Sequence, residues 1–304
     1  MSETRDVIID CDPGIDDALA LMLAAASPEL RLLGVTCVAG NRPLAQTSHN
    51  ACRVIDLAGC TSVPVLAGCA RPIARTEPRC GLVHGADGLG GVTLDSERRP
   101  QSQHATDFLA SALLSAPPGS ITLIAVGPLT NLALVEIEHP GVLQRARDVL
   151  IMGGAAFRRG NITPHAEFNF YADPMAAHVV LASGAALTVF GLDVTEQAAM
   201  TAEWITSLGT PGSRCALAAQ AMLAAYAAKE PLLHDACPVA YVVEPSLFQG
   251  ARHALSVEWR DEATEGRLYA TLPAPGGRAN ALLITGVDRP RLLSLVKERI
   301  AGLP

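Results

Sequence analysis

The stretch around which this sequence is organised is Asp6-Val7-Ile8-Ile9-Asp10-Cys11-Asp12-Pro13-Gly14-Ile15-Asp16-Asp17-Ala18-Leu19-Ala20. Its apolar run at 7–9 is typical of a strand buried on both faces. The Pro-Gly turn that follows leads into a second apolar run, 18–26, which predicts a buried helix. A strand that passes through a tight turn into a helix is the basic unit of an α/β fold.

Four carboxylates lie at this junction between strand and helix: Asp10, Asp12, Asp16 and Asp17. Capping and the helix dipole account for one or two acids at such a place, but not for four that repel one another. A hard cation, Ca²⁺ or Mg²⁺, neutralises clustered carboxylate oxygens. An acidic turn in solvent is the alternative. The metal site is favoured because open α/β sheets bind ligands beyond the carboxyl ends of buried strands.

The composition sets limits on location and partners. Apolar residues make up 49% and charged residues 17%, which predicts a large core, and the net charge of −7 argues against a nucleic-acid surface. The eight cysteines form no C-x-x-C pair and several lie in apolar runs, so we expect free thiols in a reducing compartment. No apolar run is long enough to span a membrane and residues 1–5 leave no room for a signal peptide, so we expect a soluble, cytoplasmic protein.

Apolar strands alternate with helices along the first two thirds of the chain. Strands are expected at 30–39, 63–66, 121–126, 148–152 and 186–190, and helices at 43–58, 105–115, from 129, at 173–183 and through 201–228. This alternation predicts a Rossmann-like, mostly parallel central sheet flanked by helices. The Gly-rich span 68–103 lacks regular structure and is expected to form a mobile flap.

The last part of the chain changes character. Strands at 253–259, 268–272 and 281–285 predict a small antiparallel addition, a meander, and 288–301 predicts a closing amphipathic helix. No charged linker or repeat divides the chain, so we expect one domain, residues 1–304.

Polar side chains without a packing reason recur where apolar strands end. Besides the four acids, they are Asn41, the turn 127–131, Asn161, Glu167, Asn169 and the pair His234-Asp235. Carboxyl ends of parallel strands share one edge of a sheet, so these groups are expected to converge there. Acids and amides suit a hydroxyl-rich, uncharged substrate such as a sugar.

The segment Asp10-Cys11-Asp12-Pro13-Gly14-Ile15-Asp16-Asp17-Ala18 resembles the D-x-D-x-x-x-D-D signature of the nucleoside hydrolases, the inosine–uridine-preferring family. The resemblance continues, in the order of the family and over residues 6 to about 248, through Gly40-Asn41, residues 84–88, residues 126–131, residues 161–173 and His234-Asp235. It implies an enzyme, usually a homo-oligomer, that hydrolyses the N-glycosidic bond of ribonucleosides to free base and ribose.

The resemblance also implies roles for individual residues. Ca²⁺ would be held by Asp12, Asp17, Asp235 and the backbone carbonyl of Val126, together with water and the ribose 2′- and 3′-hydroxyls. Asp12 would be the general base on the metal-bound water, and His234 would protonate the leaving base. Implied substrate contacts are Asp16, Asn41, His84, Met152, Asn161, Glu167 and Asn169, with His84 in a mobile loop over the base. A negative pocket suits the oxocarbenium-like ribosyl cation of such a reaction.

Two alternatives stay open on the residues alone. In a Mg²⁺-dependent phosphohydrolase of the haloacid-dehalogenase type, Asp10 would be the nucleophile, but position 14 is Gly and the only lysines are Lys229 and Lys297. The other alternative is a nucleoside- or sugar-binding protein without activity, against which Asp12 and His234 argue, because a binder needs no general base. Base preference, the choice of His234 or His84 as the acid, and whether Asp10 only braces the turn are not decided by the sequence.

Overall fold

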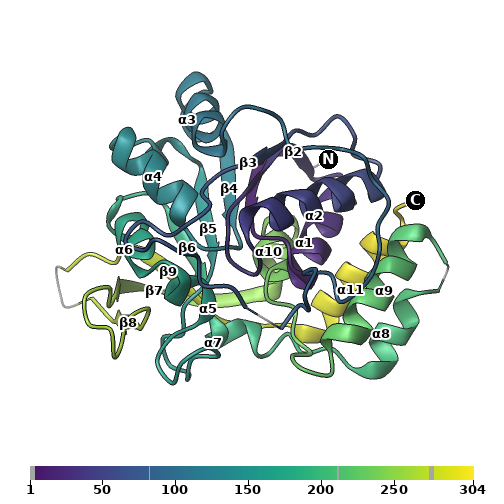
Figure 1. The fold of residues 1–304 in the computed structure, drawn as a ribbon. Helices are drawn as coiled ribbons and strands as arrows, with labels where there is room; N and C mark the ends of the chain where they lie inside the picture. Colours follow the sequence, from purple (N-terminus) through teal and green to yellow (C-terminus); the bar gives the residue numbers. More distant parts are fainter. Residues whose placement is uncertain (1–3, 82, 211, 274–276) are drawn as a thin grey trace.

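The computed structural model describes residues 4–81, 83–210, 212–273 and 277–304, so the amino-terminal residues 1–3 and Leu82 of the Gly-rich span lie outside the described residues. Within them, nine strands form one sheet in the order β3-β2-β1-β4-β5-β6-β9-β7-β8 (Figure 1). The strands are β1 (Arg5–Cys11), β2 (Leu30–Cys37), β3 (Val65–Ala67), β4 (Ile121–Ala125), β5 (Asp148–Met152), β6 (Leu187–Phe190), β7 (Phe248–Val257), β8 (Leu268–Thr271) and β9 (Ala281–Val287). The helices are α1 (Ile15–Ala25), α2 (Leu44–Leu57), α3 (Ala105–Ser115), α4 (Thr130–Glu138), α5 (Phe168–Ala172), α6 (Pro174–Ala182), α7 (Leu192–Thr195), α8 (Ala202–Leu208), α9 (Arg214–Tyr226), α10 (Ala236–Val243) and α11 (Arg289–Ala301).

Strand β1 is the point from which the sheet grows in both directions. It pairs in parallel with β2 on one side and β4 on the other, and β3, β5 and β6 continue the parallel arrangement. Alternation along β1 sends Val7 and Ile9 into the core on one face and Ile8 into the core on the other. The mostly parallel sheet expected from the sequence is therefore confirmed, and β1 ends at a switch point, where such sheets bind ligands.

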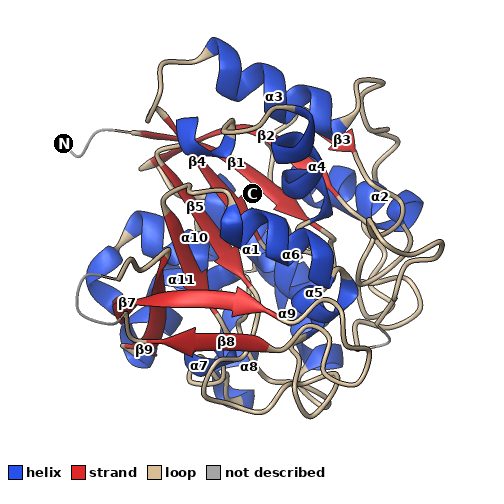
Figure 2. Cartoon of the chain, turned by 90° about the vertical axis from the view of Figure 1, so that its left-hand side faces the viewer, coloured by secondary structure: helices blue, strands red, loops and turns tan. Residues whose placement is uncertain are grey.

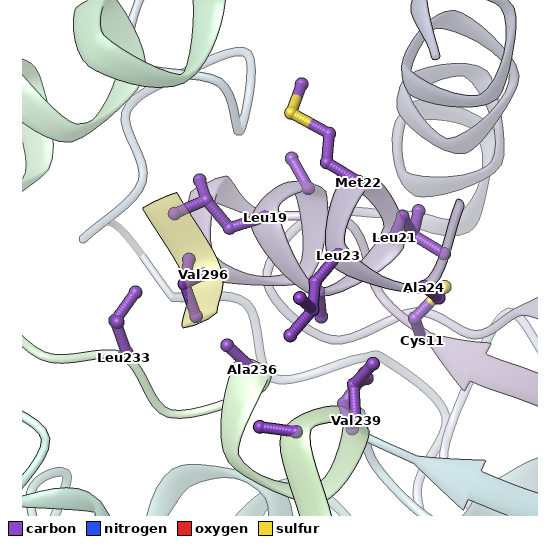
Figure 3. Close-up of a cluster of buried hydrophobic side chains, with 14 of the residues drawn as sticks. Cys11, Leu19, Leu21, Met22, Leu23, Ala24, Leu233, Ala236, Val239 and Val296 are labelled. Atoms are coloured by element: carbon purple, nitrogen blue, oxygen red, sulfur yellow. The ribbon is translucent and has the colours of Figure 1, made fainter. Parts of the chain in front are cut away.

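Helices cover both faces of the sheet. Helices α1, α2 and α8–α11 pack on one face, and α3, α4 and α6 pack on the other (Figure 1). Helix α1 lies deepest, since every residue from Ile15 to Ala24 is buried. Its Leu19 and Leu23 lie near Ala236 of α10 and Val296 of α11 (Figure 3). A helix buried on all sides has an apolar sequence, and its only acids, in the first turn, are held at the end of β1.

Helix α1 begins at Ile15, three residues earlier than the apolar run suggested. The Asp17 carboxylate accepts a hydrogen bond from the Gly14 backbone N–H at 2.9 Å, which satisfies a free donor at the start of the helix. Asp16 and Asp17 thus occupy the first turn, as expected.

The carboxyl-terminal part corrects one prediction. Strand β7 is antiparallel to β8 (Figure 2) and to β9, but β9 lies between β6 and β7 and runs parallel to β6. The expected meander is therefore wrong: β7 and β8 form the antiparallel edge. Side chains on both faces of β9 are buried: Ala281 and Leu283 pack on one face of the sheet and Ile284 on the other, as in an interior strand. Helix α11 closes the chain as expected, with Asp288 as its N-cap.

Shorter elements also differ from expectation. Helices α5 and α7 were not expected from the sequence, and the helical span 201–228 divides into α8 and α9. All eight cysteines are free thiols, as predicted. Among the described residues, no helix combines the length and apolar character required to cross a bilayer.

Candidate active site

A cavity of about 530 Å³ lies at the carboxyl ends of β1, β4 and β5. Its lining includes most of the site residues expected from the sequence: Asp16, Asn41, His84, Val126, Met152, Asn161, Glu167, Asn169, His234 and Asp235. Asp12 and Asp17 do not line the cavity because they are fully buried beside it. The fold therefore brings together groups that are more than 200 residues apart in the chain, such as Asp16 and Asp235.

Three carboxylates gather at metal-binding distances. Oxygens of Asp16, Asp17 and Asp235 all lie within 4.8 Å of one another, and all three side chains are buried. We expected Asp12 in this set, but the third member of the group is Asp16. One Asp12 oxygen, Oδ2, accepts a hydrogen bond from the Asn41 backbone N–H at 2.5 Å, and the other, Oδ1, is buried without a partner. Asp235 occupies the N-cap position of α10, but its side chain makes no capping hydrogen bond, and its carboxylate lies in the acid cluster instead.

The pKa values of these acids are raised, because the acids are buried close together with little positive charge nearby. Burial raises the pKa of Asp12 well above its usual range, and repulsion from Asp17 adds to the effect. Burial, reinforced by Asp16 and Asp17, does the same to the pKa of Asp235. Burial and the charge of Asp16 raise the pKa of Asp17 to about 6. A cluster of buried carboxylates with an unpartnered oxygen fits a hard divalent cation with oxygen ligands.

Asp10 braces the end of β1. It accepts hydrogen bonds from Thr36 Oγ1 at 2.5 Å and from Asn131 Nδ2 at 2.8 Å, and burial raises its pKa to about 7. Asn131 also donates to the Cys37 carbonyl and accepts from the Cys69 backbone N–H. The ends of β1 and β2 and the chain after β3 are thus tied together at the start of α4, in the turn 127–131 singled out from the sequence.

Asn169 and Glu167 line the cavity and bind the backbone that follows β4 and β5. Asn169 Nδ2 donates to the carbonyls of Val126 at 2.8 Å and of Met152 at 3.1 Å. The Glu167 carboxylate accepts from the backbone N–H groups of Gly154, Asn169 and Phe170, the last two at the start of α5. Glu167 therefore fixes the loop that follows β5, and Asn169 fixes two carbonyl oxygens at the strand ends.

A sequence model of the inosine-uridine preferring nucleoside hydrolases matches residues 7–294. The chain belongs to this family. Nucleoside hydrolases act on the N-glycosidic bond of ribonucleosides, so the protein is an enzyme of the N-glycosidase class.

Relatives with different base preferences are similarly close to this nucleoside hydrolase. The inosine-uridine preferring enzyme of Crithidia fasciculata is 36% identical over 89% of each chain. The pyrimidine-specific ribonucleoside hydrolase RihA of Photobacterium profundum is 37% identical over 98% of this chain and 99% of its own. A solved structure, the purine-preferring ribonucleoside hydrolase from Gardnerella vaginalis, has 29% identity and a TM-score of 0.92 over 98% of each chain. Family membership alone therefore does not decide which base this enzyme prefers.

The part of the cavity near His84 and His234 includes residues that the sequence analysis did not assign. Tyr226, at the end of α9, lines the cavity, as does Glu230 in the segment between α9 and α10. His234 Nδ1 lies 2.8 Å from Thr195 Oγ1 of α7, and His234 Nε2 lies 3.2 Å from Glu230 Oε1. In the sequence, Tyr226, Glu230 and His234 are spaced four residues apart, which is typical of one face of a helix. In the structure, however, α9 ends at Tyr226, so Glu230 and His234 lie outside it. Nothing in the sequence connects Thr195 with His234.

The two cavity histidines have opposite electrostatic environments. His84 Nδ1 accepts a hydrogen bond from the Ile15 backbone N–H at 3.1 Å, and its ring stacks on Tyr226 with centroids 5.1 Å apart. Burial lowers the pKa of His84 to about 4, so it is neutral at pH 7. Burial also opposes the charge of His234, but the hydrogen bond and charge of Glu230, with Asp16 and Glu167, outweigh it and raise the pKa of His234.

The backbone passes close to the Asp12 carboxylate at two glycines, Gly40 and Gly127. A Cβ on Gly40 would overlap Asp12 Oδ2 and lie 2.8 Å from the Pro128 ring. Gly40→Ala is expected to displace the Asp12 carboxylate and to lower kcat on the best nucleoside substrate about 100-fold, because a shift of about 1 Å at a catalytic group costs that much. Gly286→Ala is the control, since its Cβ would meet Gln249 at an ordinary 3.5 Å. Equal activity of the two variants would show that Asp12 need not hold its position.

Proposed function

We propose that this nucleoside hydrolase depends on a divalent cation, Ca²⁺, held by Asp12, Asp17, Asp235 and the Val126 carbonyl, with Asp16 close enough to take part. The buried carboxylate cluster at the end of β1 supports this proposal most directly. Its donors are all oxygens and include neither His nor Cys, a set that suits Ca²⁺ or Mg²⁺ better than a transition metal. When bound, such an ion supplies a Lewis acid that orients a diol and makes water more acidic.

Asp12 is the base in this proposal. Its unpartnered Oδ1 can accept a proton from water, while Oδ2 is held by the Asn41 N–H. Burial and, to a smaller extent, the like charge of Asp17 raise the pKa of Asp12. The carboxylate is therefore positioned and electrostatically prepared to take a proton.

The ribose and the base occupy different ends of the cavity. Asp16, Asn41, Met152, Asn161, Glu167 and Asn169 are proposed to surround the ribose, where the acids stabilise the positive charge that develops as the glycosidic bond breaks. His234 is proposed as the hydrogen-bond donor to the leaving base. His84 is proposed to line the base subsite as a neutral ring, since it cannot hold a second proton near pH 7.

The setting of the enzyme is also part of the proposal. The nine-stranded sheet supports one catalytic unit over residues 1–304. Eight free cysteines support a cytoplasmic, reducing location. The homo-oligomeric state expected from the family resemblance is retained as a proposal.

Loss of the substrate diol tests the proposal. Inosine, uridine, cytidine and adenosine are compared with their 2′-deoxy forms, with release of free base and reducing sugar measured before and after a chelator. We expect the preferred ribonucleoside to be cleaved more than about 100-fold faster than its 2′-deoxy form, because a site that binds a hydroxyl leaves buried polar groups unpaired without it. Equal rates would remove diol binding from the mechanism. Binding without turnover at saturating Ca²⁺ would favour an inactive nucleoside-binding protein.

A further inference from the structure

The segment between α9 and α10 carries Glu230 and His234 on a fixed stretch of backbone. Pro231 follows Glu230, and the Pro231 carbonyl accepts a hydrogen bond from the Met200 N–H at 2.7 Å. The Leu233 N–H in turn donates to the Ala198 carbonyl at 3.1 Å. This short antiparallel bridge to the chain after α7 fixes both ends of the Glu230–His234 segment. The contact between the two side chains is therefore built into the fold.

Both nitrogens of the His234 ring have partners of different character. Nδ1 faces Thr195, which is completely buried, and Nε2 faces Glu230, whose side chain is 22% exposed at the cavity. The Thr195 hydroxyl can donate or accept, so it permits either tautomer of His234. A carboxylate only accepts, so Glu230 requires a hydrogen on Nε2.

We propose that Glu230 is a positioning residue that fixes the His234 ring and keeps a hydrogen on its cavity-facing nitrogen, Nε2. This inference rests on the proposed function, in which His234 is the donor to the leaving base. When the bond from the ribose C1′ to the base nitrogen breaks, the bonding electron pair moves to the base. The Nε2–H group can stabilise that negative charge only if the hydrogen is on Nε2 and not on Nδ1. Nε2 carries a single hydrogen, so this hydrogen is then shared between Glu230 and the base. Glu230 therefore prepares the donor before the substrate arrives.

Substrates with different leaving groups separate this role from a general structural one. A nucleobase needs a hydrogen-bond donor to leave, whereas p-nitrophenolate leaves without one. Glu230→Ala is expected to lower kcat on the preferred nucleoside about 10- to 100-fold, the usual cost of losing a group that orients a functional histidine. Its KM should change little, and hydrolysis of p-nitrophenyl β-D-ribofuranoside should stay within about threefold of the wild type.

Three further variants complete the experiment. Glu230→Gln should be intermediate, because an amide can turn either its oxygen or its NH₂ group toward Nε2. Glu230→Ala combined with His234→Ala should be no slower than His234→Ala alone, as expected for two residues that act as a unit. Glu262→Ala, which removes an exposed carboxylate outside the cavity lining, is the control and should match the wild type.

The position of the hydrogen can be observed without turnover. In ¹⁵N spectra of histidine-labelled protein, the His234 signals, identified by their loss in His234→Ala, should show Nε2–H in the wild type and a mixture of tautomers in Glu230→Ala. Equal losses on both substrates, no loss on nucleosides, or an unchanged tautomer would each overturn the role of Glu230. A wild-type protein that cleaves neither substrate would instead overturn the proposed function, and the inference with it.

Discussion

Asp12→Asn is expected to lower kcat on the preferred ribonucleoside about 10⁴-fold, the upper range for loss of a general base, and to leave the fold intact. Asparagine has nearly the same shape, and its amide oxygen can still accept the hydrogen bond from the Asn41 N–H that Asp12 Oδ2 accepts. It cannot take a proton from water. Steady-state kinetics with the preferred nucleoside measure the effect.

The same substitution is expected to raise the melting temperature of the metal-free protein. Burial and the nearby charge of Asp17 raise the pKa of Asp12, so its ionised form costs folding free energy that a neutral amide does not. Asp12→Asn should therefore lower activity and raise stability, the trade-off expected where a residue is kept for function at a cost in stability. Calorimetry of the metal-free variant and wild type measures this difference.

Asp6→Asn is the matched control because it makes the same change at the other end of β1. Asp6 pairs with Arg31, whose side chain is 67% exposed, and such surface pairs contribute less than about 1 kcal/mol. Activity should be unchanged. If Asp12→Asn kept wild-type turnover, Asp12 would lose its role as base, and a variant that was both inactive and unfolded would indicate a structural role instead.

The sequence placed four acids at the junction of β1 and α1 because that geometry is local. Asp10, Asp12, Asp16 and Asp17 lie within eight residues of one another, and a strand, a tight turn and a helix leave these side chains few places to go. Similar reasoning placed Asn41 near the acids, since it follows the next parallel strand at the same edge of the sheet.

The features that the sequence did not reveal depend on tertiary packing. Strand β9 has the same short apolar pattern as an edge strand, and only its pairing with β6 makes it an interior strand. Thr195 and Glu230 meet His234 because the segment before α10 is fastened to the chain after α7. The closer grouping of Asp16 than of Asp12 with Asp17 and Asp235 depends on how α1 and α10 pack against each other. Such distances cannot be obtained from spacing along the chain.

Removal of divalent cations at pH 7.5 is expected to lower the melting temperature by about 5 °C and to abolish turnover. An ion present at about 100 times its Kd stabilises the folded state by about 2.7 kcal/mol, which corresponds to a shift of that size in a chain of this length. Scanning calorimetry with excess Ca²⁺ and with a chelator measures the difference, and nucleoside hydrolysis is followed on the same samples.

The fall in melting temperature on cation removal should be much smaller at pH 5, because protons can then neutralise the acids in place of the ion. The pKa of Asp10 is raised to about 7 and that of Asp17 to about 6, both mainly by burial, from an ordinary value of 3.8. The folded metal-free state therefore binds more protons than the unfolded state between about pH 4 and pH 7, and its stability falls as pH rises through that window. Bound Ca²⁺ compensates the same negative charge, so the metal-loaded protein should show a weaker dependence on pH. If the melting temperature at pH 7.5 were the same with Ca²⁺ and with chelator, groups of the protein itself would have to neutralise the acids. The proposed cation site would then be wrong.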